Sequence, residues 1–323
     1  TKKKRQPKTV MPIEPGSIQE PAPEKVPAGV LQPIAASVLM QMLYGARYAR
    51  PDLLRGISLL ARKMTKWRPM QDIQLHRLIC YLKSTLSYRQ YAWVGDEREQ
   101  LKLHLYTDAD LASDPEDSVS TSGAYFAIVG PRTHVPLGHR CKRQTAVSHS
   151  STESELVSAD HGLKSIGLPA LDLWELLLER PIDQVGLQMF QDNDACCRVC
   201  RSGKNPNMTH IGRTHRISVA WLHDQLQTNN VKMYRADSEL MAADIFTKPF
   251  PDAKASTWRS NLQLINIVDS TLEGTIDYNP SMVQSMRGDL DKPKVVNINE
   301  ADLRDSEAVS YTHLRAHETR GNL

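Results

Sequence analysis

Four acidic residues, spread along the middle of the chain, are of the type that could hold catalytic metal ions. They are Asp108, Glu155, Asp192 and Asp244. Magnesium prefers carboxylate and water oxygens in octahedral geometry. Two ions about 4 Å apart can activate an attacking water and stabilise a leaving oxygen. If the fold brings these carboxylates to one edge of a sheet, their chemistry is phosphodiester hydrolysis with two Mg²⁺ ions, for which Mn²⁺ would substitute.

The elements that must position these carboxylates begin with a strand. Leu101, Leu103 and Leu105 alternate with polar neighbours, which is typical of a strand, and we expect it to end at Asp108. A hairpin should follow, with a turn at Gly130-Pro131 between its strands. Asp192 should follow a buried strand that begins at Gly186. The expected strands after the first are residues 125–129, 134–142, 186–191 and 231–236.

Helices should separate the later strands. The spacing of Ser150-Ser-Thr-Glu153 is that of a capping box, which predicts a helix that starts there and is interrupted at Gly167-Leu-Pro169. Further helices are expected at residues 170–180, 193–202, 215–228 and 239–246. Three strands followed by strands that alternate with helices predict an α/β fold. It should be a mixed five-stranded sheet flanked by helices.

Two carboxylates near the expected site leave a choice. Glu155 shares a helical face with Ala159 and Leu163, the face that should pack on the sheet, whereas Glu153 lies on a more polar face. We therefore expect Glu155 to point to the metals and Glu153 to cap the helix. Asp110 shares a face with Asp108 but should lie beyond the strand end. The Asp110 carboxylate could contact a metal, but by default we expect it to be a solvated loop carboxylate.

The chain divides by composition into four segments. Residues 1–30 are basic and proline-rich and are expected to be disordered. Residues 35–94 have apolar residues at helical spacing, which predicts a small helical subdomain before the 101–250 domain. Residues 251–323 should form one helix and then a disordered tail. Its last part, from Tyr311 to Arg320, resembles a translated sequencing adapter and is assigned no function.

The overall composition excludes some classes of protein. The net charge is only +3, which permits binding to nucleic acid without arguing for it. An odd count of five cysteines is a poor disulfide framework and suggests a reducing compartment. Cys197 and Cys200, with His210 and His215, could bind zinc, but cysteines on a helix are more often part of a core. No apolar run is long enough to cross a membrane.

Several motifs together resemble the ribonuclease H domain of copia-type LTR retrotransposon Pol polyproteins. They are Tyr106-Thr-Asp-Ala-Asp110, Ser120-Thr-Ser-Gly123, Ser150-Ser-Thr-Glu-Ser-Glu155, Gln191-Asp-Asn193 and Ala243-Asp-Ile-Phe-Thr-Lys-Pro249. Upstream, Leu43-Tyr-Gly-Ala-Arg-Tyr-Ala-Arg-Pro-Asp52 resembles the end of the same polyprotein's reverse transcriptase. The chain is thus similar to a C-terminal Pol fragment. Residues 35–94 would be a thumb- or connection-like remnant and residues 101–250 a ribonuclease H-like domain.

The resemblance implies an endoribonuclease that cuts the RNA strand of RNA–DNA hybrids. Its metal ligands map to Asp108, Glu155, Asp192 and Asp244. The implied partners are the hybrid and the rest of the polyprotein, inside a cytoplasmic particle or the nucleus and not secreted. Reverse transcription would belong only to the parent polyprotein, since the chain contains no Tyr-x-Asp-Asp motif. Residues that could contact the hybrid's phosphates are Lys142, Arg143, Lys204, Arg213 and Lys248.

Two departures and two alternatives accompany this interpretation. Gln191 stands where family members often have Cys, and the residues from Arg213 to Ile217 depart from the usual Arg-Thr-Lys-His-Ile, which puts an auxiliary histidine in doubt. The main alternative is a catalytically decayed copy that at most binds nucleic acid. An integrase-like enzyme is disfavoured, because integrases place a Glu last, whereas Asp244 is last here.

Overall fold

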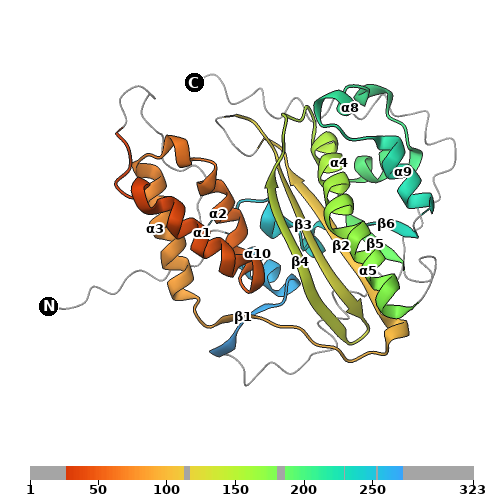
Figure 1. The fold of residues 1–323 in the computed structure, drawn as a ribbon, viewed down its shortest axis with the longest axis horizontal. Helices are drawn as coiled ribbons and strands as arrows, with labels where there is room; N and C mark the ends of the chain where they lie inside the picture. The colour runs from red at the N-terminus through yellow and green to blue at the C-terminus, as the bar shows by residue number, and fades with distance from the viewer. Residues whose placement is uncertain (1–26, 113–116, 180–185, 229, 252–253, 272–323) are drawn as a thin grey trace. The chain divides into compact units, whose positions relative to one another are not determined.

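A computed structural model describes residues 27–112, 117–179, 186–228, 230–251 and 254–271 (Figure 1). All of them belong to one compact unit within residues Thr1–Met286. The expectations for residues 1–26 and 272–323, the terminal tail included, concern residues outside this description. Among the described residues, no helix combines the length and hydropathy that a membrane span requires.

Within the described residues, five strands form one mixed sheet in the order β4-β3-β2-β5-β6 (Figure 1). The first three pair antiparallel, and β5 and β6 pair parallel beside β2. This is the mixed five-stranded sheet that the order of the elements predicted. The strands are β2 (Lys102–Asp110), β3 (Thr121–Gly130), β4 (Thr133–Arg143), β5 (Leu187–Gln191) and β6 (Val231–Arg235).

One face of the sheet is covered by the helices that follow the β3–β4 hairpin in sequence. Leu105 and Phe126 share a buried apolar cluster with Leu156 of α4 and Cys200 of α7. Because side chains alternate along a strand, the neighbours of these strand residues point to the other face. The helices that follow the hairpin are α4 (Ser151–Gly162), α5 (Leu168–Leu178), α7 (Asp194–Ser202), α8 (Ile211–Thr214) and α9 (Val219–Thr228).

The other face packs against the helices that precede the sheet. Tyr125 and Ala127 join a second buried cluster with Leu39, Ile57 and Leu78, one from each of these helices. Phe246 and Trp258, which follow the sheet in sequence, belong to the same cluster. The helical segment and the sheet therefore share one core. These helices are α1 (Gln32–Tyr48), α2 (Leu54–Ala61) and α3 (Pro69–Ser84), with α10 (Ala255–Leu264) after the sheet.

The apolar spacing of residues 35–94 predicted a helical segment, but the segment is not helical throughout. A short strand, β1 (Tyr88–Gln90), pairs antiparallel with β7 (Ile267–Asp269), which follows α10. The partner strand lies far along the chain, so no local pattern in residues 88–90 could have identified the pairing. The strand ties the end of the helical segment to the last described residues.

Two helices differ from the predicted ones because of their backbone. The break predicted at Gly167-Leu-Pro169 is absent. A π-turn at Leu163–Gly167, in which the Leu168 N–H donates to the Leu163 carbonyl, joins α4 directly to α5. This local change in the hydrogen-bond pattern directly precedes Pro169, which lacks an N–H, so the proline does not end the helix. Conversely, the helix predicted at 215–228 begins only at Val219. Arg216 adopts a left-handed φ of 58°, which interrupts a helix.

The first strand and the last expected helix also required correction. Strand β2 continues to Asp110, which is therefore a strand residue that forms an ion pair with Arg55, not a solvated loop carboxylate. Residues 239–246 form two separate 3₁₀ turns, Ser238–Leu240 and Asp244–Phe246, instead of one α-helix. The second turn packs against β3 and α10, so tertiary contacts rather than helix propensity set its conformation.

Candidate metal centre

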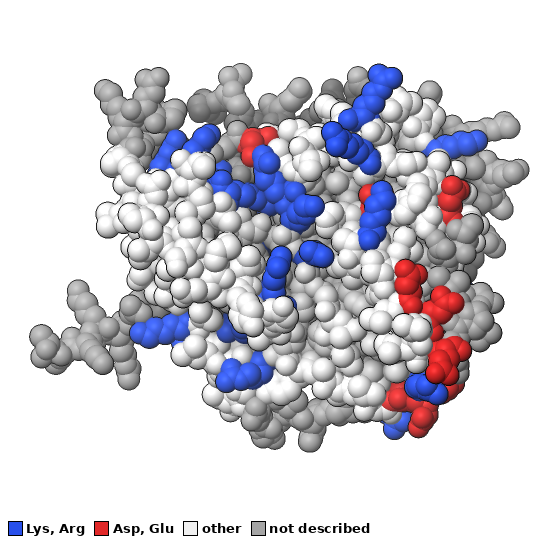
Figure 2. Space-filling model, in the orientation of Figure 1, with Lys and Arg blue, Asp and Glu red and all other residues white. Residues whose placement is uncertain are grey.

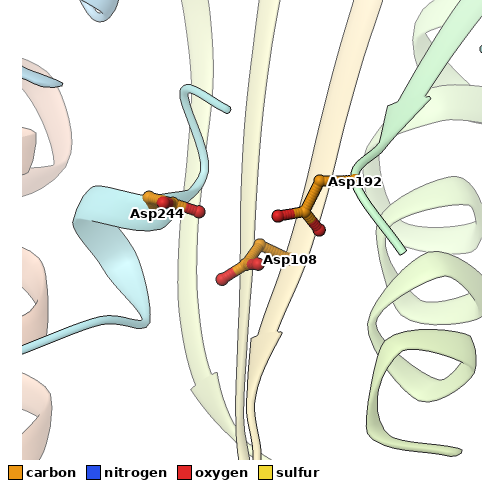
Figure 3. A group of neighbouring side chains, drawn as sticks. All are labelled: Asp108, Asp192 and Asp244. Carbon is orange, nitrogen blue, oxygen red and sulfur yellow. The ribbon is translucent and has the colours of Figure 1, made fainter. Parts of the chain in front are cut away.

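Among the described residues, one group of side chains has the spacing of metal ligands: Asp108, Asp192 and Asp244. One carboxylate oxygen of each lies within 4.8 Å of the other two, and Figure 3 shows the three side chains pointing toward one another. Asp108 is in β2, Asp192 directly follows β5, and Asp244 begins a 3₁₀ turn. Because β2 and β5 are parallel neighbours, their carboxyl ends meet at one edge of the sheet.

Glu155 lies beside this group, on the first turns of α4, but it is not one of the three converging carboxylates. Its side chain is buried, and its Oε2 accepts a hydrogen bond of 3.1 Å from Gln191 Nε2. Its role as a fourth metal ligand therefore stays a prediction. Ser150 caps the helix, because its Oγ accepts the Glu153 backbone N–H at 3.1 Å. The Glu153 carboxylate, predicted to cap the helix, accepts instead from the N–H of His149, one residue before the cap.

Gln191 links the fourth carboxylate to the end of β5. While its amide nitrogen donates to Glu155, its Oε1 accepts the backbone N–H groups of Asp192, at 2.8 Å, and of Asn193, at 3.3 Å. Gln191 is fully buried. The sequence marked this position only as a departure from the family pattern, and no local signal indicated that its side chain would hold both Glu155 and the Asp192 backbone.

The ammonium group of Lys248 lies among the three aspartates. Its Nζ is 2.7 Å from Asp244 Oδ1, 3.5 Å from Asp108 Oδ1 and 3.6 Å from Asp192 Oδ2. The predicted contact of Lys248 with a substrate phosphate stays a prediction. In the structure, this lysine supplies positive charge to the carboxylate group itself.

Burial and mutual repulsion shape the electrostatics of the centre. Burial raises the pKa of Asp108 against the opposing effects of Lys248 and the Thr247 hydroxyl. Burial, and then the charge of Asp108, raises the pKa of Asp244 to about 7. Burial together with Asp108 and Asp192 raises the pKa of Glu155 well above its usual range. Burial alone would lower the pKa of Lys248, but Asp108 and Asp244 outweigh it and raise that pKa.

The donor set fits a divalent cation. All the converging atoms are hard carboxylate oxygens, which suit Mg²⁺ or Mn²⁺. In the described part of the chain, the buried Asp108 Oδ1 accepts no hydrogen bond. A crowded group of acidic side chains with one lysine gains more from an added divalent charge than from further neutral partners.

Thr247 connects the aspartates of β2 and of the 3₁₀ turn. Its hydroxyl donates to Asp108 Oδ2, and its backbone N–H donates to the Asp244 carbonyl at 3.1 Å. The turn approaches β3 closely at Gly123, which pairs directly with Asp108. A Cβ placed on Gly123 would lie 2.6 Å from Thr247 Cγ2 and 3.0 Å from the Ala243 carbonyl oxygen. The site geometry therefore requires glycine at this position.

Gly123→Ala should consequently push the 3₁₀ turn, with Asp244, away from Asp108. We expect a loss of about 1–3 kcal/mol in the free energy of unfolding from overpacking and a weaker affinity for Mn²⁺. Urea denaturation and Mn²⁺ titration would measure the two effects. Gly138→Ala on the neighbouring strand β4 is the matched control, because its Cβ would meet Phe126 Cβ at an ordinary 3.4 Å. Equal behaviour of the two variants would contradict the prediction.

The other predicted nucleic-acid contacts belong to segments that carry none of the three aspartates. Lys142 is exposed on β4, with its Nζ 3.2 Å from His161 Nε2, and Arg143 on the same strand pairs with Asp117. Lys204 and Arg213 are exposed after α7 and on α8. Figure 2 shows lysine and arginine side chains gathered between α2 and the β3–β4 hairpin, whereas acidic side chains gather near the end of α5.

The cysteines and histidines considered for zinc are not brought together. Cys197 and Cys200 are unpaired and buried in the apolar cluster that covers the sheet. The Nε2 atoms of His210 and His215 lie instead 3.3 and 3.0 Å from Glu153 Oε1. These contacts favour the interpretation of the cysteines as core residues.

Sequence comparisons connect the chain to retroelement polyproteins. The retrovirus-related Pol polyproteins from transposons RE2 and RE1 of Arabidopsis thaliana are each 26% identical to it over 224 residues. This match covers 69% of the chain and 14% of each polyprotein, so the chain spans only a small part of these relatives. No protein-family model matches the chain.

Two further similarities concern smaller parts of the chain. The secreted RxLR effector protein 161 of Plasmopara viticola is 32% identical over 123 residues, which cover 38% of this chain and 81% of the effector. Among solved structures, LC11-RNase H1 from compost aligns with 45% of this chain and 92% of its own, at 14% identity and a TM-score of 0.30. The homologues of the chain are therefore retrovirus-related Pol polyproteins from copia-type transposons, and the similarity extends to this effector protein.

Proposed function

We propose that the chain carries a ribonuclease H, an endonuclease that hydrolyses the RNA strand of RNA–DNA hybrids with two divalent metal ions. The observation that carries this proposal is the convergence of Asp108, Asp192 and Asp244 at the carboxyl edge of a mixed sheet. These aspartates come from three elements that are distant in sequence. The similarity of the chain to retroelement Pol polyproteins further supports the proposal. Mg²⁺ is the proposed ion, and Mn²⁺ would substitute for it.

The roles of the residues follow from their positions. When bound, the ions would activate a water and stabilise the leaving oxygen of the phosphodiester. Asp108, Asp192 and Asp244 would hold them, with Glu155 as the fourth carboxylate. Thr247 would keep Asp108 oriented through its hydroxyl. Lys248 now supplies positive charge to the aspartates. Once bound metal ions supply that charge, its side chain would be free to turn toward a phosphate.

The proposed substrate is recognised by shape and backbone charge, without sequence preference. Lys142, Arg143, Lys204 and Arg213 are proposed phosphate contacts, all of them outside the group of aspartates. The remaining Pol polyprotein is the proposed protein partner. An intracellular location, in a particle or in the nucleus, is consistent with five unpaired cysteines.

A hybrid-cleavage assay with the full chain tests the proposal. An RNA–DNA hybrid labelled on its RNA strand should be cut in Mg²⁺, and EDTA should reduce cleavage to background because the carboxylates alone cannot activate water. Single-stranded RNA and double-stranded DNA of the same sequence serve as substrate controls. Persistent cleavage in EDTA would contradict the metal mechanism. Hybrid binding without cleavage in either metal would favour the alternative of a catalytically decayed copy.

A further inference from the structure

Arg55 belongs to helix α2, outside the segment that carries the four carboxylates, yet its side chain contacts two residues beside the candidate metal centre. Its Nε donates to the Thr247 carbonyl at 2.8 Å. Its Nη2 lies 3.6 Å from Asp110 Oδ2, at the end of strand β2. The Arg55 side chain is only 14% exposed, so both contacts are shielded from water. One guanidinium thus joins the 3₁₀ turn to the first strand.

The two residues that Arg55 contacts are next to metal-centre aspartates. Thr247 is the residue whose hydroxyl donates to Asp108 and whose N–H donates to the Asp244 carbonyl. Asp110 lies two positions beyond Asp108 on the same face of β2. Holding Thr247 and Asp110 in place therefore restrains Asp108 and Asp244 relative to each other.

The packing around Arg55 supports a fixed position for its side chain. Ile57 and Leu60 of α2 are buried in the same apolar cluster as Ile245 and Phe246 of the 3₁₀ turn. The planar guanidinium can donate in two directions at once with little loss of side-chain entropy, which a lysine ammonium on a flexible stem does less well. Helix and turn are thus joined by apolar packing and by one shielded cation.

We propose that Arg55 is a positioning residue for the metal centre, through which the helical segment completes a site whose carboxylates lie in residues 101–250. The inference rests on the proposed function and adds a residue to it that no carboxylate motif contains. Arg55 does not touch the reacting atoms. It sets the separation of Asp108 from Asp244, on which the binding of a divalent ion depends.

The test uses Arg55→Met in the full chain, with MnCl₂ alone as the probe. Electron paramagnetic resonance of free Mn²⁺ gives the affinity without any catalytic turnover, and steady-state hybrid cleavage gives kcat and KM. Outer residues that orient metal ligands typically change affinity or activity by about 10–100-fold. We expect Mn²⁺ affinity to fall by about 10-fold and kcat by about 10–100-fold, with KM within about 3-fold of the wild type.

Arg62→Met is the matched control. Arg62 directly follows α2, and its Nη2 donates to Thr121 Oγ1 at 3.0 Å, on strand β3 and not on the 3₁₀ turn. It should bind Mn²⁺ as the wild type does. Wild-type Mn²⁺ affinity and kcat in Arg55→Met would overturn the proposal, as would an equal loss in both variants.

The outcomes separate this inference from the proposed function. If the wild type neither binds Mn²⁺ nor cuts hybrid, the proposed function fails and the inference fails with it. If the wild type does both and Arg55→Met is unchanged, only the inference fails. Should Arg55→Met not fold, Arg55→Gln, which keeps one donor for Thr247, takes its place with the same criteria. Unfolding of both variants would show a purely structural role and overturn the proposal.

Discussion

Asp192→Asn is expected to abolish hybrid cleavage, with a loss in kcat of at least about 100-fold, while the chain stays folded. Replacing an orienting residue outside the ligand shell already costs about 10–100-fold, so the loss of a ligand charge should cost more. Asparagine keeps the size of the side chain and can still accept from Ser238, whose hydroxyl is 3.2 Å from Asp192 Oδ2. Cleavage of labelled hybrid measures the effect.

The thermal midpoint of this variant should not fall. Asp192 adds to the repulsion that raises the pKa of both Glu155 and Asp244. Removal of its charge therefore lowers the electrostatic repulsion within the folded state. Asp194→Asn is the matched control, because Asp194 is two residues further along the chain, 62% exposed and paired with Arg235. It should retain full activity. Cleavage by Asp192→Asn at the rate of the wild type would contradict the assignment of Asp192 to the metal site.

Glu155→Gln and Glu153→Gln are expected to have opposite effects. Glu155 is the proposed fourth ligand, so its neutral form should reduce kcat by at least about 100-fold with little change in stability. Glu153 should matter for folding, because its buried carboxylate accepts from the His149 N–H at 2.9 Å and pairs with His210 and His215. Glutamine keeps only one acceptor oxygen for these partners, so the variant should lose about 1–3 kcal/mol in the free energy of unfolding, as when a buried hydrogen-bonding group loses its partner.

Chemical denaturation and hybrid cleavage, measured on both variants at a temperature where both are folded, test this pair. Glu153→Gln should keep kcat within about 3-fold of the wild type once its smaller folded fraction is taken into account. The reverse pattern, an inactive Glu153→Gln beside an active Glu155→Gln, would exchange the roles of the two residues. Equal activity in both would remove Glu155 from the site.

Strands and capped helices were predictable because their signals are local. The alternation of Leu101, Leu103 and Leu105 is complete within the segment that forms β2, and the side chain of Ser150 caps α4 three residues away. The positions of the four carboxylates near strand ends and helix starts were likewise local signals, and the family resemblance added the ribonuclease H activity as an expectation. Patterns of this kind can be recognised without tertiary information, since each depends on residues within one turn or one strand.

The segments that were predicted wrongly take their structure from distant partners. Residues 239–246 have helix-forming composition, but packing of Phe246 in the core shared with α1–α3 holds them as 3₁₀ turns. Residues 88–90 become a strand only because residues 267–269 pair with them. In both places a tertiary contact outweighs a weak local propensity.

The sequence by itself determined which carboxylates are available, their order along the chain and, through helical spacing, that Glu155 faces the sheet. Only the tertiary structure decided that three of the four meet within 4.8 Å while Glu155 bonds to Gln191. It also decided which neutral and basic residues surround them. Thr247 reaches Asp108 across 139 residues, and Arg55 reaches Thr247 across 192. Such contacts leave no periodic trace, because they arise only when separate elements pack together.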